Sequence, residues 1–341
     1  MLPWIVLSIA VVLSFALTAG LLRYAINRNL MDVPNGRSSH SVATPRGGGM
    51  AIVVSFLFAL AVLAFSKLVG WTQAWALLGS GVSIAILGFL DDHGHIAARW
   101  RLLGHFAAAA WALMWLGGLP PLIFFGFSLD MGWLGHGLAA VYLVWLLNLY
   151  NFMDGIDGIA SVEAICVCLG GALLYLMAGA AQPTDFLLPA LLAAAVAGFL
   201  FWNFPPARIF MGDAGSGFLG ITIGVLSIQA AWVSPALFWA WLILLGVFVV
   251  DATFTLFRRL LRGDKVYEAH RSHAYQYASR RYGNHLPVTA AVLLINVFWL
   301  LPVAVWVGIG GIDALLGLVI AYLPLVGLAI KYRAGELERS I

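Results

Sequence analysis

Two adjacent carboxylates, Asp91 and Asp92, follow an apolar stretch that ends in Gly-Phe-Leu. Adjacent helical residues do not share a face, and two like charges this close raise each other's pKa. A helix C-terminus also disfavours anions, so the pair costs free energy unless a cation or a proton-transfer role offsets it. We therefore predict a functional role for this pair rather than a solvated helix end.

Four amide or carboxylate side chains recur every third residue at the end of another apolar stretch: Asn148, Asn151, Asp154 and Asp157. This spacing predicts one slowly drifting stripe along a helix. Each of the two aspartates is followed by glycine, which breaks the helix and lets backbone N–H groups approach a ligand. Such a stripe suits the uracil and ribose of a nucleotide, or a hydrated metal.

The segment 203–217 begins with Asn203 and carries two prolines, an arginine and a glycine-rich run around Asp213. The prolines end one helix and the glycines precede the next. Asp213 should lie at the N-terminus of that next helix, beside free N–H donors. This arrangement predicts a cradle for phosphate and for a Mg²⁺ that bridges phosphate oxygens.

A basic loop holds His270, Arg271 and His273. These side chains offer three donors toward phosphate oxygens, or two nitrogens toward a metal. Because the neighbouring sequence lacks a third ligand for a metal such as zinc, we favour phosphate contact. A basic loop attracted to anionic lipid is the alternative.

Other polar residues support weaker predictions. The turn-rich, basic segment 32–49 includes His40 and either covers a site as a flap or serves as a connector. Glu163 and Asp251 lie inside apolar stretches, where a carboxylate is a functional candidate by default. We nevertheless favour structural pairing for both.

The elements that position these groups are apolar stretches of about 20 residues, the length that spans a bilayer core of about 30 Å. The predicted spans are residues 3–22, 49–68, 72–90, 102–120, 133–151, 159–179, 186–203, 214–232, 236–257, 288–308 and 312–330. The sequence thus predicts an all-α integral membrane protein with about eleven transmembrane helices. No loop is long enough for a separate soluble domain, so residues 1–341 form one polytopic domain. The largest loop, about residues 258–287, has room for one short amphipathic helix.

Basic residues predict the orientation of these spans. Of the 18 Lys and Arg residues, Lys67 alone falls in an even-numbered connection. The positive-inside rule then places the odd loops, the candidate site and the C-terminus in the cytoplasm, and the N-terminus in the periplasm. Arg99 and Arg101 fall in the third connection, between the predicted spans 72–90 and 102–120.

Composition agrees with a membrane protein, since 62% of residues are hydrophobic and 10% are charged. The net charge of +3 resides in loops, so no nucleic acid is needed as a partner. Cys166 and Cys168 lie one residue apart in one span and point to different faces, which argues against a disulfide or a metal pair.

Together these motifs resemble the polyprenyl-phosphate N-acetylhexosamine-1-phosphate transferase family. That family includes the phospho-N-acetylmuramoyl-pentapeptide transferase of peptidoglycan synthesis and the enzymes that start O-antigen and enterobacterial common antigen. The resemblance runs from Pro34-Asn35 to the histidine loop and includes the Pro45–Gly49 turn and the run from Phe210 to Ser216. The order of the motifs agrees with the loop parity derived above.

The resemblance implies transfer of a sugar 1-phosphate from a UDP-N-acetyl sugar to undecaprenyl phosphate at the bacterial inner membrane, with release of UMP. It implies Mg²⁺ as cofactor, with Mn²⁺ as an alternative, and leaves a homodimer open. By position, Asp213, Asp92 and Asn151 resemble the metal residues, and Asp91 and Asp92 the acidic pair at the acceptor phosphate. The implied catalytic residues are Asp91, Asp92, Asp213, His270 and His273. The implied substrate-binding residues are His40, Arg99, Asn148, Asn151, Asp154, Asp157, Asn203, Phe210 and Arg271, with Phe210 able to stack on uracil.

One departure bears on the pathway. The muramoyl-pentapeptide enzymes carry consecutive histidines in the last loop, whereas Arg271 and Ser272 separate His270 from His273 here. With the short loops, this favours an initiator of O-antigen or another surface polysaccharide over a peptidoglycan enzyme. The sugar is then N-acetylglucosamine or a 6-deoxy relative such as N-acetylfucosamine or N-acetylquinovosamine.

Two other classes of protein fit the sequence less well. A transporter or flippase of lipid-linked sugars would need polar residues at both faces and the midplane of the membrane, and here they stop at one face. A CDP-alcohol phosphotransferase would need an arginine soon after the Asp-Gly step, which the sequence after Asp157 does not supply.

Overall fold

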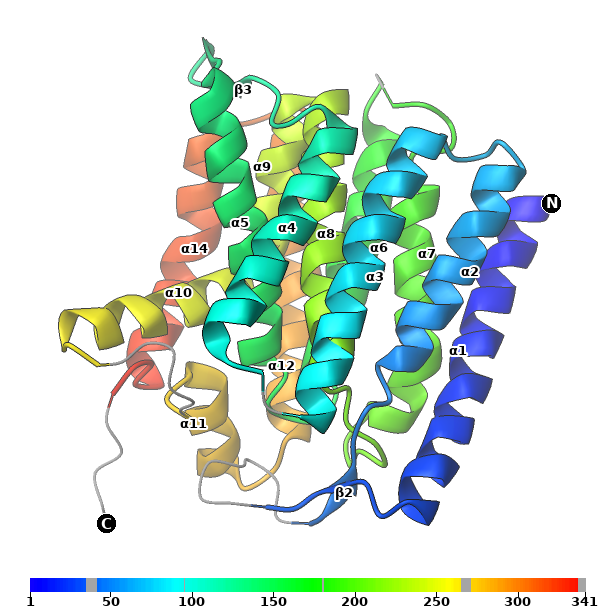
Figure 1. Ribbon diagram of the computed structural model, residues 1–341. Coiled ribbons are helices and arrows are strands. Elements are labelled where there is room, and N and C mark those ends of the chain that lie inside the picture. Colours follow the sequence, from blue (N-terminus) through cyan, green and yellow to red (C-terminus); the bar gives the residue numbers. More distant parts are fainter. Residues whose placement is uncertain (35–41, 95, 180, 265–270, 337–341) are drawn as a thin grey trace.

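The predicted apolar stretches are helical in the computed structural model, which describes residues 1–34, 42–94, 96–179, 181–264 and 271–336 (Figure 1). The first eight correspond to α1 (Leu2–Asn27), α2 (Met50–Phe65), α3 (Trp71–His93), α4 (Ala98–Leu116), α5 (Gly132–Met153), α6 (Ile159–Met177), α7 (Leu187–Asn203) and α8 (Asp213–Val233). The remaining helices are α9 (Pro235–Leu244), α10 (Gly246–Leu261), α11 (Ala274–Tyr282), α12 (Leu286–Ile295), the π-helical η1 (Asn296–Leu300), α13 (Leu301–Gly308) and α14 (Ala314–Lys331). Two short antiparallel pairs complete the described elements, β1 (Met31–Asp32) with β2 (Thr44–Pro45) and β3 (Leu122–Phe124) with β4 (Phe127–Leu129).

Some of these elements reach membrane-spanning length. Within the described ranges, seven helices are long and apolar enough to cross a bilayer, or eight if one bent pair counts as a span. The helices α2 and α7 are apolar but shorter, with 16 and 17 residues. The protein is therefore a multi-pass, all-α membrane protein, and the count of eleven spans stays a prediction.

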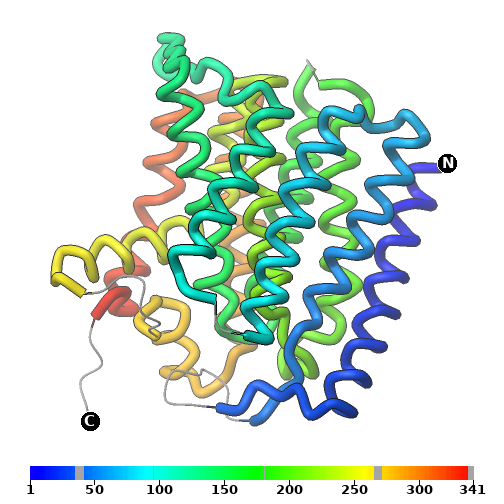
Figure 2. Tube along the Cα trace, in the orientation of Figure 1, coloured from blue at the N-terminus to red at the C-terminus, as the bar shows by residue number. Residues whose placement is uncertain are grey.

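The ninth predicted span is not one straight helix. It divides into α9 and α10, whose axes differ by 71° across the break at Leu245. In Figure 2, α10 leaves the bundle sideways at the end where the long loops lie. The span predicted over 236–257 is therefore a bent pair of helices, because hydropathy measures apolar length but not direction.

Helix α8 lies at the centre of the bundle, and 89% of the residues in its 18-residue apolar stretch are buried. Glycines let its neighbours approach closely. A Cβ on Gly220 would lie 2.5 Å from the carbonyl oxygen of Leu146 in α5, and one on Gly88 would lie 2.6 Å from the Cα of Ala214. Small residues therefore set the spacing of α3 and α5 around α8, as is common between membrane helices.

The two acids inside apolar stretches are paired, as favoured from the sequence. Glu163 accepts a hydrogen bond from the side-chain amide of Asn296 at 2.6 Å, where the π-helix η1 begins. The carboxylate of Asp251 accepts the backbone N–H groups of Ala274 and Tyr275 at 2.9 and 3.0 Å. Asp251 thus caps the short helix α11, which lies in the large loop.

Loops that are far apart in sequence collect at one end of the bundle. Figure 1 shows the β1–β2 segment, the α3–α4 turn and α11 at the lower end, with the N-terminus near the other end. The polar motifs therefore share one end, as the odd-loop pattern predicts. Which side of the membrane this end faces remains a prediction.

Candidate active site at the loop end of the bundle

The N-terminus of α8 is the point where three of the predicted motifs meet. Asp92, at the end of α3, accepts the backbone N–H groups of Asp213 and Ala214 with its two carboxylate oxygens, at 3.1 and 3.3 Å. The preceding residue, Gly212, has φ of +79°, and a Cβ there would lie 2.9 Å from Asp92. Asp92 therefore caps α8 across 121 residues of sequence, and the helix dipole stabilises its charge.

Arg46 from the first loop joins both carboxylates. Its Nη2 atom lies 2.8 Å from Asp92 and 2.6 Å from Asp213. Burial disfavours the charged guanidinium, but the nearby Asp213 and Asp92 outweigh that effect and raise the pKa of Arg46. The positive charge of Arg46 stabilises the carboxylate of Asp92 at the C-terminal end of α3.

Backbone hydrogen bonds bring Arg46 to this place. The segment 45–49 runs beside residues 210–211, where Phe210 donates to the carbonyl of Pro45 at 2.8 Å. Gly48 and Gly49 donate in turn to the carbonyls of Phe210 and Met211, both at 2.9 Å. A Cβ on Gly49 would lie 2.5 Å from the Cα of Gly215, so glycine is required at this close approach.

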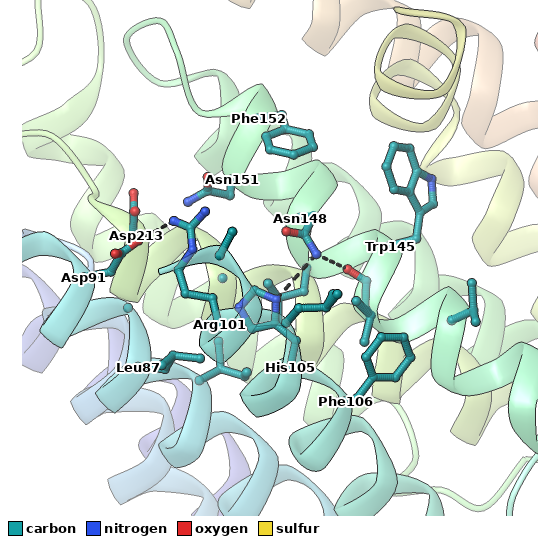
Figure 3. A pocket seen from close by; sticks show the side chains of 18 of the residues that line it. Leu87, Asp91, Arg101, His105, Phe106, Trp145, Asn148, Asn151, Phe152 and Asp213 are labelled. Atoms are coloured by element: carbon teal, nitrogen blue, oxygen red, sulfur yellow. Dashed lines mark hydrogen bonds and ion pairs between the residues drawn. The ribbon is translucent and has the colours of Figure 1, made fainter. Parts of the chain in front are cut away.

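Asp91 points away from Asp92 and serves a different contact. Its carboxylate forms an ion pair with Arg101 of α4 and accepts the backbone N–H of Ile96 at 3.0 Å. Figure 3 shows Asp91 and Arg101 side by side, with Asn151 and Asp213 close to them. The two aspartates therefore hold two different elements, α4 and α8.

A large cavity of about 480 Å³ extends from this polar point between α3, α4, α5 and α8 (Figure 3). Its polar end holds Asp91, Arg101, Asn151 and Asp213. The rest of its wall is mostly apolar, with Ile84, Leu87, Phe106, Val141, Val144, Trp145, Leu147 and Leu256. We call this cavity the apolar groove. Its form suits a molecule with a charged head and a long hydrocarbon tail.

Within the apolar groove, Asn148 lies beside His105. Its amide nitrogen donates to the carbonyl of Val144 at 2.7 Å and lies 3.5 Å from the imidazole Nδ1 of His105. His105 is one helical turn after Arg101 on α4, so both side chains face the groove. Asn148 thus borders the groove and not the polar cavity described next.

A smaller cavity of about 200 Å³ lies on the other side of Asn151 and Asp213. We call it the polar cavity; its wall includes Asp32, Arg46, Asp154, Asp157, Gln276 and His285. Asn151 and Asp213 line both cavities, and Asn151 donates to the hydroxyl of Ser216 on α8 at 3.2 Å. Two spaces of different character therefore meet at these two side chains.

Asp154, in the wall of the polar cavity, has a pKa that its surroundings raise. Burial raises its pKa well above the usual 3.8, and the neighbouring carboxylates of Asp213, Asp92 and Asp157 add to the shift against the opposing effect of Arg46. The cavity thus concentrates negative charge, and a cation bound there would be stabilised.

The stripe predicted from Asn148 to Asp157 ends earlier than expected. Helix α5 stops at Met153, and Gly158, with φ of +74°, starts α6. Asp157 lies in the turn between them, 3.0 Å from the imidazole of His285, and also accepts the backbone N–H of Ala207 at 3.0 Å. Its role is to hold this turn against the seventh loop and α12.

A third cavity of about 560 Å³ opens beyond this turn. The third cavity shares three lining residues with the polar cavity: Phe210, Asp157 and His285. Its wall also includes Arg280 and Asn284, which do not line the polar cavity. An aromatic ring between two polar spaces can stack on a base, as predicted for Phe210.

Two predicted site residues make structural contacts, and one of them, Asn203, also lines the polar cavity. The amide oxygen of Asn203 accepts the backbone N–H of Gly158 at 3.1 Å, and its nitrogen donates to the carbonyl of Ile209 at 3.0 Å, so Asn203 joins two loops. His273 is 2% exposed, and its Nδ1 lies 3.2 Å from Asp251 at the start of α11. Direct substrate contact by His273 is thus not supported, because its ring is inside the protein.

Arg99 was wrongly placed by the sequence analysis. Helix α4 begins at Ala98, so Arg99 and Arg101 are helical and not in a loop. Arg99 stacks over Trp100 with 5.7 Å to the ring centroid and does not line the groove, whereas Arg101 does. Two residues apart on a helix lie about 200° apart, so only one of them faces the groove.

The remaining predicted residues are Arg271, His40 and His270. Arg271 is partly buried beside α11, and its carbonyl accepts a hydrogen bond from Arg280 at 3.2 Å. His40 and His270 lie outside the described residues. The role of this loop toward phosphate stays a prediction.

Sequence reasoning missed Arg101, His105 and His285 as site residues. One pattern could have predicted two of them, since Arg101 and His105 are four residues apart and share a helical face. His105, however, is an isolated polar residue inside a predicted apolar span. His285 lies near the end of the large loop, twelve residues after His273, and no motif marks it.

The carboxylates of the polar cavity can hold a magnesium ion that also binds waters and substrate phosphates. Among the described residues, no three His, Cys, Asp or Glu side chains are grouped to hold a metal. Mg²⁺ is commonly held by one or two carboxylates together with waters and substrate phosphates. Asp213, at 26% side-chain exposure, and Asp154 supply such carboxylates beside the polar cavity. Asp92 does not, because both its oxygens hold α8, and we remove it from the candidate metal ligands.

The fold and site define a class: a multi-pass membrane protein in which an apolar groove meets a polar, carboxylate-lined cavity. Residues 74–231 match the model of a family described as glycosyl transferase family 4. The chain is 32% identical over 268 residues to a probable undecaprenyl-phosphate N-acetylglucosaminyl 1-phosphate transferase of Bacillus subtilis, covering 74% of this chain and 70% of the relative.

Two further relatives represent other branches. A decaprenyl-phosphate N-acetylglucosaminephosphotransferase of Mycolicibacterium smegmatis is 28% identical, over 88% of this chain and 78% of the relative. A phospho-N-acetylmuramoyl-pentapeptide-transferase of Moorella thermoacetica is 34% identical, over 57% of this chain and 64% of the relative. The chain therefore belongs to glycosyl transferase family 4, among the polyprenyl-phosphate N-acetylhexosamine-1-phosphate transferases that the sequence resembled.

Proposed function

We propose that this protein transfers an N-acetylhexosamine 1-phosphate from a UDP-sugar to undecaprenyl phosphate and so starts a surface polysaccharide such as O-antigen. The observation that carries the proposal is the meeting of the apolar groove and the polar cavity at Asn151 and Asp213. A polyprenyl phosphate fits the groove with its phosphate near Arg101, and the donor diphosphate fits the polar cavity. The two reacting phosphates would then approach each other at the shared wall.

The reaction is a displacement at phosphorus. An oxygen of the acceptor phosphate bonds to the sugar-bearing phosphorus of the donor, and the bond from that phosphorus to the oxygen of the UMP phosphate breaks. UMP leaves with that oxygen, and the product is a lipid diphosphate sugar. A phosphate monoester has a second pKa near 6, so the acceptor is largely dianionic at neutral pH and needs no strong base.

The protein contributes positioning and charge. Asp91 holds Arg101 beside the groove, and Arg101 and His105 would bind the acceptor phosphate. Asp92 holds α8 so that Asp213 faces both cavities. Asp213, with Asp154 and Asn151 near it, would hold Mg²⁺, which when bound neutralises the donor diphosphate. Arrangements of this kind lower the barrier by bringing the reactants together and by stabilising developing charge.

The donor's nucleoside would lie toward Phe210, and the site would face the cytoplasm of the bacterial inner membrane, where the odd loops are placed by the charge pattern. The relatives that act with N-acetylglucosamine match more of this chain than the muramoyl-pentapeptide relative does, which supports a simple N-acetyl sugar. A peptidoglycan role is therefore the second candidate and enters the test below.

The test is incubation of the purified protein with undecaprenyl phosphate, Mg²⁺ and a panel of UDP-sugars, with UMP release measured by chromatography. The panel holds the UDP derivatives of N-acetylglucosamine, N-acetylfucosamine, N-acetylquinovosamine and N-acetylmuramoyl-pentapeptide. We expect UMP release with one of the first three that depends on the lipid acceptor. Asp213→Asn should lose it, whereas Asp185→Asn, at the opposite end of the bundle, should not. Release with the pentapeptide alone would assign the protein to peptidoglycan synthesis, and release with none would refute the proposal.

A further inference from the structure

Arg46 is paired with Asp213, the carboxylate proposed above to hold the divalent cation, and also contacts Asp92. A single nitrogen, Nη2, lies 2.6 Å from Asp213 and 2.8 Å from Asp92. The three residues come from three separate segments, and Arg46 is the most exposed of them, at 39% against 26% and 6%. Its guanidinium can therefore leave more easily than either carboxylate can move.

The two carboxylates differ in what else holds them. Both oxygens of Asp92 accept backbone N–H groups of α8, so Asp92 stays in place without Arg46. Among the described side chains, Asp213 has Arg46 as its one partner. Removal of the guanidinium would thus free Asp213 and leave Asp92 where it is.

The surrounding charge is unbalanced. The carboxylates of Asp213, Asp92, Asp32 and Asp154 all act on Arg46 and raise its pKa. Arg46 is also the cation that opposes the raised pKa of Asp154. If Arg46 moved away, the polar cavity would hold several carboxylates with much less positive charge near them.

We infer that Arg46 takes the place of the divalent cation while no donor is bound, and moves to the donor diphosphate when one binds. The inference rests on the proposed function and adds an order of events to it. A guanidinium pairs well with phosphate oxygens, so the donor offers Arg46 an alternative partner. Asp213 is then released for the cation.

This exchange makes the binding of donor and cation cooperative. Each ligand strengthens the binding of the other by the same factor, because coupling free energy is reciprocal. A purely structural Arg46, which ties the first loop to α8, would produce no such coupling. That loop is in any case held by the backbone bonds of Gly48 and Gly49, which substitution of Arg46 leaves intact.

The experiment measures Mn²⁺ binding by electron paramagnetic resonance on the purified protein, with and without UDP. In Arg46→Ala, Mn²⁺ alone should bind about tenfold more tightly than in wild type, since one competing positive charge is gone. UDP should tighten Mn²⁺ binding strongly in wild type and about tenfold less in the variant. Arg46→Lys keeps the charge and should behave like wild type.

Arg208→Ala is the matched control, because Arg208 is an exposed arginine of the seventh loop that stacks over Trp202 at 5.5 Å. It should change neither quantity. If Arg46→Ala weakens Mn²⁺ binding, or leaves the effect of UDP unchanged, the exchange is refuted. If the coupling is present but no UDP-sugar supports transfer, the proposed reaction fails and the exchange stands.

Discussion

The assignment of Asp92 as a cap, and not a metal ligand, predicts a specific effect of Asp92→Asn. The substitution keeps one acceptor oxygen and turns the other into an NH₂ group that faces a backbone N–H of α8. One charge-assisted hydrogen bond is lost, at a cost of about 1.5–3 kcal/mol. The side chain is 6% exposed, so solvent screens little of this effect.

We therefore expect Asp92→Asn to lose about 1.5–3 kcal/mol of stability. At about 2 °C per kcal/mol, a conservative value for a chain of this size, the unfolding temperature falls by about 3–6 °C. The assay is thermal unfolding in detergent, followed by the intrinsic fluorescence of the tryptophans. Mn²⁺ affinity should change much less than in the Asp213 variant.

Asp213→Asn is the comparison that separates the two roles. Its ion pair with Arg46 is partly exposed, and such pairs contribute about 0–1 kcal/mol, so its unfolding temperature should stay near that of wild type. Its turnover should fall by about 10²–10³ if it holds the cation. The reasoning is refuted if Asp92→Asn unfolds at the wild-type temperature and loses Mn²⁺ binding.

Three further predictions follow from the site and the topology. Arg101→Ala should raise KM for undecaprenyl phosphate more than for the UDP-sugar, whereas Arg99→Ala should raise neither; steady-state kinetics with each substrate varied will check this. Asp154 has a pKa raised above 3.8 by burial, so its contribution to stability is greatest below pH 3.8 and is lost as pH rises toward the raised value. Asp154→Asn should therefore unfold at a higher temperature than wild type at pH 7 without divalent cations, and the gap should shrink on acidification; a gap that grows instead would contradict the assignment. In a cysteine-free background, a cysteine at Ser128 should react with an impermeant thiol reagent added to intact cells, and one at Asn284 should not; the reverse pattern would invert the topology.

Much of the fold could be predicted because apolar length and helical geometry are local properties. Every predicted apolar stretch is helical, and the described part of the loop with the most basic residues contains the short helix α11. The site end was predictable for the same reason: alternate loops between spans lie on one side, so polar motifs in odd loops must gather. That Asp213 begins a helix also followed from the glycine-rich run before it.

The contacts of individual side chains were not predictable in this way. The sequence marks Asp91 and Asp92 as a pair, yet one holds Arg101 of α4 and the other holds the start of α8. Likewise, His273 looked like a phosphate donor, but α11 turns it toward Asp251. In each case the partner lies at least ten residues away, on another element.

The sequence by itself determined that this chain crosses a membrane many times and that its polar motifs share one end, because hydropathy, helical period and loop charge are read from neighbouring residues. Tertiary structure alone decided that Arg101 and not Arg99 faces the groove, that Asp92 caps α8, and that α10 turns away from α9 at 71°. These outcomes depend on how helices pack and rotate against one another. Packing is set by contacts such as that of Gly88 with Ala214, between residues far apart along the chain, and no local pattern encodes them.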